Sequence, residues 1–111
     1  MKRHCLLFAL LLFAAIASAA VLGGWQPIKN LKDPHVVEIG QFAVEEYNKR
    51  SNAHLTLVKL VKGEQQVVSG MNYRLILAVK EGKASKKYEA VVWEKTWENF
   101  RNLTSFEPVE G

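Results

Sequence analysis

A single helical segment is followed only by alternating segments, and this order restricts the fold more than any other feature of the chain. Asp33 is a favourable helix cap, and Pro34 suits the first helical position. Apolar residues then recur at helical spacing as far as "KRSN" at 49–52. The rest of the chain alternates between apolar and polar residues, as half-buried strands do. We therefore expect an α+β domain, in which one helix packs on a four- to five-stranded antiparallel sheet.

Four strands are expected after the helix. The clearest lies within 71–81, where apolar residues at every second position face one way. In the strand before it, the apolar residues change phase near Leu57, which predicts a β-bulge. A short edge strand from Trp25 to Ile28, interrupted by Pro27, would complete the sheet. The four expected strands lie within residues 54–68, 71–81, 86–97 and 99–106.

The first twenty residues are predicted to be a secretory signal peptide. Lys2 and Arg3 precede an apolar run at 6–13, and the small residues "AAIASAA" follow it. Cleavage after Ala19 or Ala20 would leave residues 21–111 as one secreted domain. The alternative is an uncleaved membrane anchor, since the apolar segment is nearly long enough to span a bilayer.

Composition argues against several classes of function. The only cysteine, Cys5, lies in the predicted signal peptide, so we expect no disulfide, no thiol nucleophile and no cysteine-based metal site in the mature domain. Without Lys2 and Arg3 the chain has 13 basic and 11 acidic side chains, a balance that does not favour nucleic acid binding. His35 and His54 have no catalytic or metal-binding partners in the sequence, so solvated or capping roles are expected. We predict neither an enzyme nor a protein that needs a cofactor or metal.

Three apolar features are expected at one end of the sheet. In an antiparallel meander the turns at 66–70 and 95–99 fall at the same end, and they carry Val67, Val68 and Trp97. The segment around Gly23 and Gly24 can reach this end as well. Each feature alone could be a strand end, a core residue or a flexible terminus. Together they are typical of a surface that binds another protein.

The sequence resembles the plant cystatins, which inhibit papain-like cysteine proteases. Residues 66–70 match the Gln-x-Val-x-Gly loop of that family, and Ile39 to Asn48, "IGQFAVEEYN", matches its helix signature. A glycine pair also matches the N-terminal arm of the family. The resemblance implies a reversible, competitive inhibitor that acts in plant defence and in the control of endogenous proteolysis. It implies protease contacts by Gly23, Gly24, Gln66, Val67, Val68, Ser69, Gly70, Thr96 and Trp97.

The second turn departs from the family pattern. The family usually carries Pro-Trp there, whereas this chain has Thr96-Trp97, so the turn is expected to be less rigid and binding weaker. The alternative is a non-inhibitory binding or storage protein on the same fold. We expect a monomer, although hairpins of this kind can be exchanged between chains in a swapped dimer. Asn102-Leu103-Thr104 is a sequon for N-glycosylation if the chain is secreted.

Overall fold

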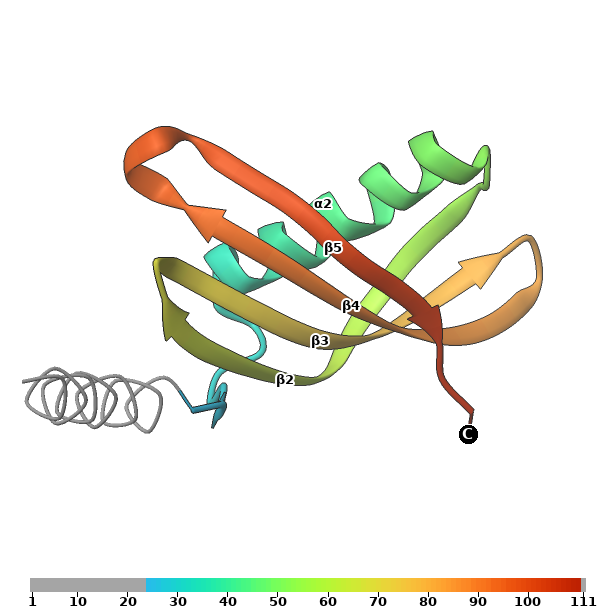
Figure 1. The fold of residues 1–111 in the computed structure, drawn as a ribbon. Helices are drawn as coiled ribbons and strands as arrows, with labels where there is room; N and C mark the ends of the chain where they lie inside the picture. Colours follow the sequence, from blue (N-terminus) through green and yellow to red (C-terminus); the bar gives the residue numbers. More distant parts are fainter. Residues whose placement is uncertain (1–23, 111) are drawn as a thin grey trace, which may run out of the picture.

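The computed structural model describes residues 24–110, so the predicted signal peptide and Gly23 lie outside the described residues. A five-stranded antiparallel sheet in the order β1-β2-β3-β4-β5 curves around one helix, α2 (Figure 1). The expected α+β architecture is therefore confirmed. The elements are β1 Gln26–Pro27, α2 Pro34–Ser51, β2 Leu55–Val68, β3 Gly70–Glu81, β4 Ala84–Lys95, the 3₁₀ helix η1 Thr96–Glu98 and β5 Phe100–Pro108.

Local sequence signals fix both ends of α2. The side chain of Asp33 accepts a hydrogen bond from the backbone N–H of His35 at 2.8 Å, which satisfies one of the free donors of the first turn. Pro34 occupies the first turn, where its missing N–H costs nothing. Asn52 ends the helix in the left-handed conformation, with φ of 57°. The predicted start and end of the helix are both confirmed.

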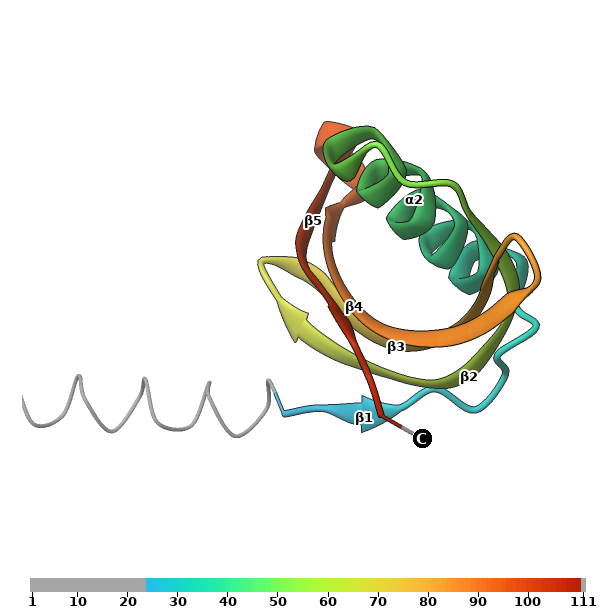
Figure 2. The same cartoon turned by 90° about the vertical axis from the view of Figure 1, so that its right-hand side faces the viewer.

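The core lies between α2 and the concave face of the sheet. Alternate residues of β3 and β4 point toward the helix, which presents one apolar stripe in return. Figure 2 shows the helix lying within the curve of the strands. The least exposed core residues, all at 1% or below, are Ile39, Ala43, Val44, Leu75, Leu77, Val79, Ala90 and Val92.

Strand β2 bends because its register with β3 shifts twice. One shift lies between Leu57 and Lys59, which confirms the bulge predicted near Leu57. The second, between Leu60 and Lys62, was not expected from the sequence. Extra residues of this kind bend and twist a strand, and here they help the sheet to wrap around the helix (Figure 2).

The connections divide the molecule into two ends. The β2–β3 hairpin and the β4–β5 connection lie together at one end, on the left of Figure 1, and the chain enters β1 on the same side. The β3–β4 turn and the end of α2 lie at the opposite end. None of the helices within residues 24–110 combines the length and the apolar character needed to cross a bilayer.

Candidate functional site

The first element of the candidate site is the tip of the β2–β3 hairpin. Only Ser69 separates the two strands, so the turn is tight. The side chains of Val67 and Val68 are 62% and 39% exposed, which is unusual for adjacent valines. Gly70 permits the return of the chain because its φ of +92° is one that L side chains rarely adopt. Gln66 is half-buried beside the tip, and its side-chain oxygen accepts a hydrogen bond from Asn72 Nδ2 at 3.3 Å.

The second element is the connection between β4 and β5. The sequence predicted a simple turn here, and the structure instead forms the short 3₁₀ helix η1. Its end is held by a hydrogen bond from the Asn99 N–H to the Thr96 carbonyl at 3.2 Å, with Asn99 in the left-handed conformation. Trp97 projects from η1 with 64% of its surface exposed. Thr96 is exposed as well.

The two hairpins line one open groove of about 480 Å³. The geometric expectation that these turns meet at one end is therefore confirmed for the described residues. The groove carries apolar and aromatic side chains but ends on polar groups of β4 and α2. Its lining residues are His35, Val67, Val68, Ser69, Gly70, Met71, Tyr73, Glu94, Thr96 and Trp97.

A network of charged and polar side chains borders the groove. Glu94 is only 4% exposed, and one of its carboxylate oxygens lies 2.7 Å from Nε2 of His35. Arg101 donates from Nε to the other oxygen at 2.7 Å and also donates to Glu38 on α2. The hydrogen bond from Arg101, reinforced by its charge, lowers the pKa of Glu38 below the usual value of about 4.5. The network ties the first turn of α2 to the strands that carry η1.

The same network shifts the pKa of one of its own members, Arg101, and of the neighbouring Tyr73. Burial alone would lower the pKa of Arg101, but its hydrogen bonds to Glu38 and Glu94 outweigh this and raise it. Burial, together with the nearby charge of Glu94, raises the pKa of the Tyr73 hydroxyl. From the sequence, His35 is expected to be solvated or to have a capping role, and the hydrogen bond between its Nε2 and the buried carboxylate of Glu94 corrects that expectation.

The N-terminal segment is the third element. Gln26 pairs with Gln65, so continuing the antiparallel register by two residues brings Gly24 level with Val67.

Trp25 is held in place by Arg74, whose guanidinium carbon lies 4.3 Å from the centre of the indole ring. Arg74 in turn donates to Glu64 from Nε and a terminal nitrogen, at 3.0 and 2.7 Å. The described start of the chain is thus fixed beside the first hairpin.

Trp93 is a residue at this end of the sheet that sequence reasoning missed. Its indole Nε1–H donates to the carbonyl of Ser69 at 2.7 Å, which links β4 to the turn between β2 and β3. The alternation along the strand was the available signal. Val92 and Glu94 are both buried toward the helix, so Trp93 between them places a large aromatic side chain on the outward face of the sheet. Arg74 was missed for a different reason, because its contact with Trp25 depends on strand pairing.

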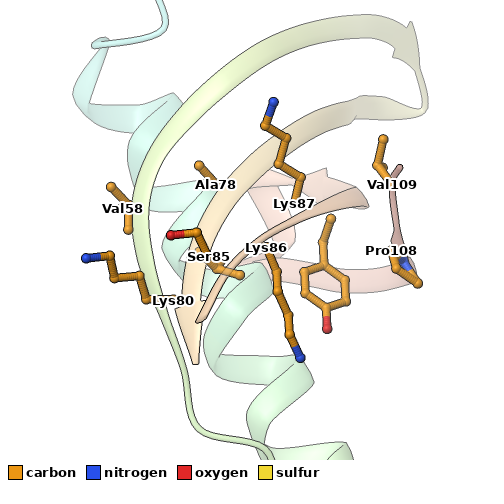
Figure 3. A pocket seen from close by; sticks show the side chains of 10 residues that line it. Val58, Ala78, Lys80, Ser85, Lys86, Lys87, Pro108 and Val109 are labelled. Carbon is orange, nitrogen blue, oxygen red and sulfur yellow. The ribbon is translucent and has the colours of Figure 1, made fainter. Parts of the chain in front are cut away.

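A separate hollow of about 440 Å³ lies at the opposite end of the sheet (Figure 3). Apolar side chains of β2, β3 and the C-terminal segment line it, including Val58, Ala78 and Val109. Lys80, Lys86 and Lys87 lie around it (Figure 3). None of the predicted contact residues belongs to this hollow.

Two other predicted features can be located. Asn102 lies on β5, half-buried and paired with Trp93, so the sequon is part of a regular strand. Thr104 of the sequon donates a hydrogen bond to the carbonyl of Val91 at 3.1 Å. Within residues 24–110, histidine, cysteine and acidic side chains form no group of three or more that could hold a metal ion.

Comparisons with known proteins agree with this arrangement. Residues 28–109 match a family model described as SQAPI, an aspartic acid proteinase inhibitor. Over 96 residues the chain is 58% identical to "Cysteine proteinase inhibitor 5" of Arabidopsis thaliana, covering 86% of this chain and 79% of that protein. The chain belongs to the plant cystatin family.

Solved structures support the same family fold. The salivary cystatin of the soft tick Ornithodoros moubata superposes with a TM-score of 0.69 at 22% identity, covering 79% of this chain and 98% of that one. The squash aspartic acid proteinase inhibitor superposes with a TM-score of 0.62 at 29% identity, covering 78% of this chain and 94% of that one. Plant cystatins are proteinase inhibitors, so membership of the family also means that this chain is not an enzyme.

Proposed function

We propose that this plant cystatin is a reversible, competitive inhibitor of papain-like cysteine proteases. The single observation that carries the proposal is the juxtaposition of Val67, Val68 and Trp97 around one groove, all exposed and all carried by tight turns. A protein surface with this composition is suited to bury itself in an apolar cleft. The identity of 58% to a cysteine proteinase inhibitor indicates which class of protein supplies the cleft.

The binding energy would come mainly from apolar burial. Each valine contributes about 1.5–2 kcal/mol when fully buried, and an indole contributes more. The tip valines and Trp97 protrude from β-hairpins that are already ordered, so little conformational entropy is lost on binding. We propose that the two hairpins enter the cleft beside the catalytic cysteine and histidine of the protease. No peptide bond of the inhibitor need reach the nucleophile, so the inhibitor is not cleaved.

The N-terminal arm would extend this contact along the substrate subsites. Gly24 directly precedes Trp25, which Arg74 holds against the sheet. Glycine at 23 and 24 lets the backbone approach the protease closely, because there is no side chain to exclude it. We further propose that the protein is secreted after removal of residues 1–20 and acts in plant defence and in the control of endogenous proteolysis.

Inhibition kinetics with papain test the proposal. We expect competitive, reversible inhibition by the purified protein, and an inhibition constant weaker than about 10 μM, on the order of −7 kcal/mol, would overturn it. Trp97→Ala should weaken inhibition by about 2–4 kcal/mol, roughly 30- to 1000-fold, as expected for a central aromatic anchor. If Trp97→Ala inhibits as well as the wild type, the second hairpin is not part of the contact.

The chain provides a matched control for the first hairpin. Val67 and Val58 lie on the same strand and are 62% and 54% exposed, but they lie about 30 Å apart along it. Val67→Ala should weaken inhibition roughly tenfold, the equivalent of about 1.5 kcal/mol, whereas Val58→Ala should leave it unchanged. Equal effects of the two changes would contradict a contact limited to the hairpin end.

Two alternative functions predict different results in the same inhibition assay. The matched family model is described as an aspartic acid proteinase inhibitor, so pepsin belongs in the panel as a second target class. Inhibition of pepsin alone would replace the proposed target, and we expect no inhibition of serine or metalloproteases. A non-inhibitory binding or storage protein would inhibit none of these enzymes.

A further inference from the structure

The hydrogen bond between Trp93 and Ser69 joins two segments that the proposed function needs in a fixed relation. Ser69 is the turn residue of the first hairpin, and Trp93 lies two residues before the end of β4, close to η1. The donor–acceptor distance of 2.7 Å lies within the normal range for an N–H group and a carbonyl. It spans 24 residues of sequence, so it is a tertiary contact and not part of the hairpin itself.

The indole of Trp93 is itself held firmly. Its ring meets the ring of Phe100 edge to face, with centroids 5.2 Å apart and an interplanar angle of 75°. The ammonium of Lys95 lies 4.7 Å from the centroid of each ring. Lys95 and Phe100 are the residues on either side of η1 and its cap. The donor that reaches Ser69 is therefore fixed to both ends of the second hairpin.

Next to Ser69, the backbone of the first hairpin also packs closely against the backbone of β4. A Cβ at Gly70 would lie 2.2 Å from the carbonyl oxygen of Glu94, so only glycine permits this approach. Ser69 is bonded by Trp93 and the next residue packs against the backbone of Glu94. Movement of the valine tip relative to Trp97 would break the hydrogen bond or the packing.

We infer that Trp93 is a positioning residue of the inhibitory surface, acting through the Ser69 carbonyl to set the angle between the two hairpins. The inference rests on the proposed function in so far as it concerns inhibition. A binding surface made of two separate hairpins loses affinity when they move independently, because their relative position must then be fixed on binding. In this role Trp93 need not touch the protease.

The test is a conservative change with a matched control, both made in bacteria so that Asn102 carries no glycan. Trp93→Phe removes the N–H donor and keeps an aromatic ring beside Phe100 and Lys95. We expect inhibition of papain to weaken about 3- to 10-fold. Thr104→Val removes a side-chain hydrogen bond from β5 to a backbone carbonyl of β4, away from the hairpin tip, and it should leave the inhibition constant unchanged. Wild-type inhibition by Trp93→Phe would overturn the inference.

A double-mutant cycle separates positioning from direct contact. In a background of Val67→Ala and Val68→Ala, the tip has little left to position, so the effect of Trp93→Phe should shrink toward none. An undiminished effect in that background would mean that Trp93 contacts the protease itself, and would overturn the inference.

Hydrogen exchange of the free protein tests the same contact without a protease. The chain has three tryptophans, and in the wild type the indole N–H of Trp93 should exchange more slowly than that of Trp97. In Trp93→Phe the backbone amides around Ser69 should exchange faster than in Thr104→Val. Failure of these exchange results refutes the positioning role. Failure of papain inhibition with these results intact refutes the proposed function alone.

Discussion

Gly70 is the most restricted residue of the groove between the two hairpins. Two independent facts require glycine there: a φ of +92°, and a would-be Cβ only 2.2 Å from the Glu94 carbonyl oxygen. The Gln-x-Val-x-Gly pattern is therefore explained by backbone geometry at its last residue. The glycine sets the path of the chain and the valines supply the exposed surface.

We predict that Gly70→Ala destabilises the protein by at least about 2 kcal/mol, because both the positive φ and the clash oppose it. Gly82→Ala is the control, since Gly82 also has a positive φ, +61°, but nothing lies within 4 Å of its would-be Cβ. That change should cost only about 1 kcal/mol. Urea denaturation of the two variants measures the difference. Equal losses would show that the strands separate at Gly70 without cost.

Thr96 is the residue at which this chain departs from the usual Pro-Trp turn. It is the first residue of η1, a position where a helix tolerates proline. Lys95 before it is extended, with φ of −126° and ψ of 100°, which is near the conformation that a following proline favours. Nothing in this local backbone excludes proline at position 96.

Thr96→Pro should therefore tighten inhibition of papain, by about 0.4–1 kcal/mol, because the free turn has less conformational freedom to lose. The melting temperature should not fall, since Thr96 is exposed and outside the core and a compatible proline also restricts the unfolded chain. The inhibition constants of wild type and variant decide the matter. Weaker inhibition by the variant would indicate that the threonine turn meets the protease in a conformation that proline cannot adopt.

The elements divide into those that local sequence predicts and those that it does not. Asp33-Pro34 and Asn52 bound α2 as expected, because capping depends on a few neighbouring residues. The phase change at Leu57 revealed one bulge of β2, but the apolar pattern gave no sign of the second. Helix η1 was missed because three residues are too few to show a period.

The candidate site follows the same division. Val67, Val68 and Trp97 were found because an apolar residue in a turn is visible in the sequence. Trp93 and the Glu94 network were not, because each depends on which side chains the sheet and helix bring together. Glu94 is bonded to His35, 59 residues away in the chain. No local pattern carries that information.

Exposed ion pairs between and within elements predict how stability changes in acid. Hydrogen bonds from Arg101 and from Lys86 lower the pKa of Glu38 and Glu81, respectively, below about 4.5. A carboxylate with a lowered folded-state pKa adds stability above its unfolded-state pKa, and this is lost as the pH falls through the folded-state value. The melting temperature should therefore fall as the pH drops from about 6 to about 3.

Substitution identifies the carboxylates responsible. Glu38→Gln and Glu81→Gln should each reduce the fall in melting temperature, because the neutral amide no longer titrates. Glu107→Gln is the control, since Glu107 is exposed on β5 and forms no ion pair within residues 24–110. Thermal melts across the pH range provide the measurement. If the melting temperatures of all three variants fell equally with pH, the two ion pairs would not couple protonation to folding.

At the scale of the whole molecule, folding and proposed binding use opposite kinds of surface. The concave face of the sheet and the apolar stripe of α2 form one continuous core. The exposed apolar residues Val67 and Val68 belong to the β2–β3 hairpin and Trp97 to η1, and these two connections lie together at one end of the molecule (Figure 1). Changes at that end should therefore affect inhibition more than stability, apart from those that disturb the backbone at Gly70.

Noncovalent interactions alone must hold this domain together. The chain has one cysteine, Cys5, which lies outside the described residues, so no disulfide can form within a single chain. We predict that the melting temperature is the same with and without reductant, because apolar packing and hydrogen bonds are insensitive to it. Differential scanning calorimetry of the protein under both conditions provides the measurement, and Cys5→Ser is the control. A lower melting temperature in reductant, absent in Cys5→Ser, would mean instead that Cys5 is retained and joins two chains, and that the folded state is a covalent dimer.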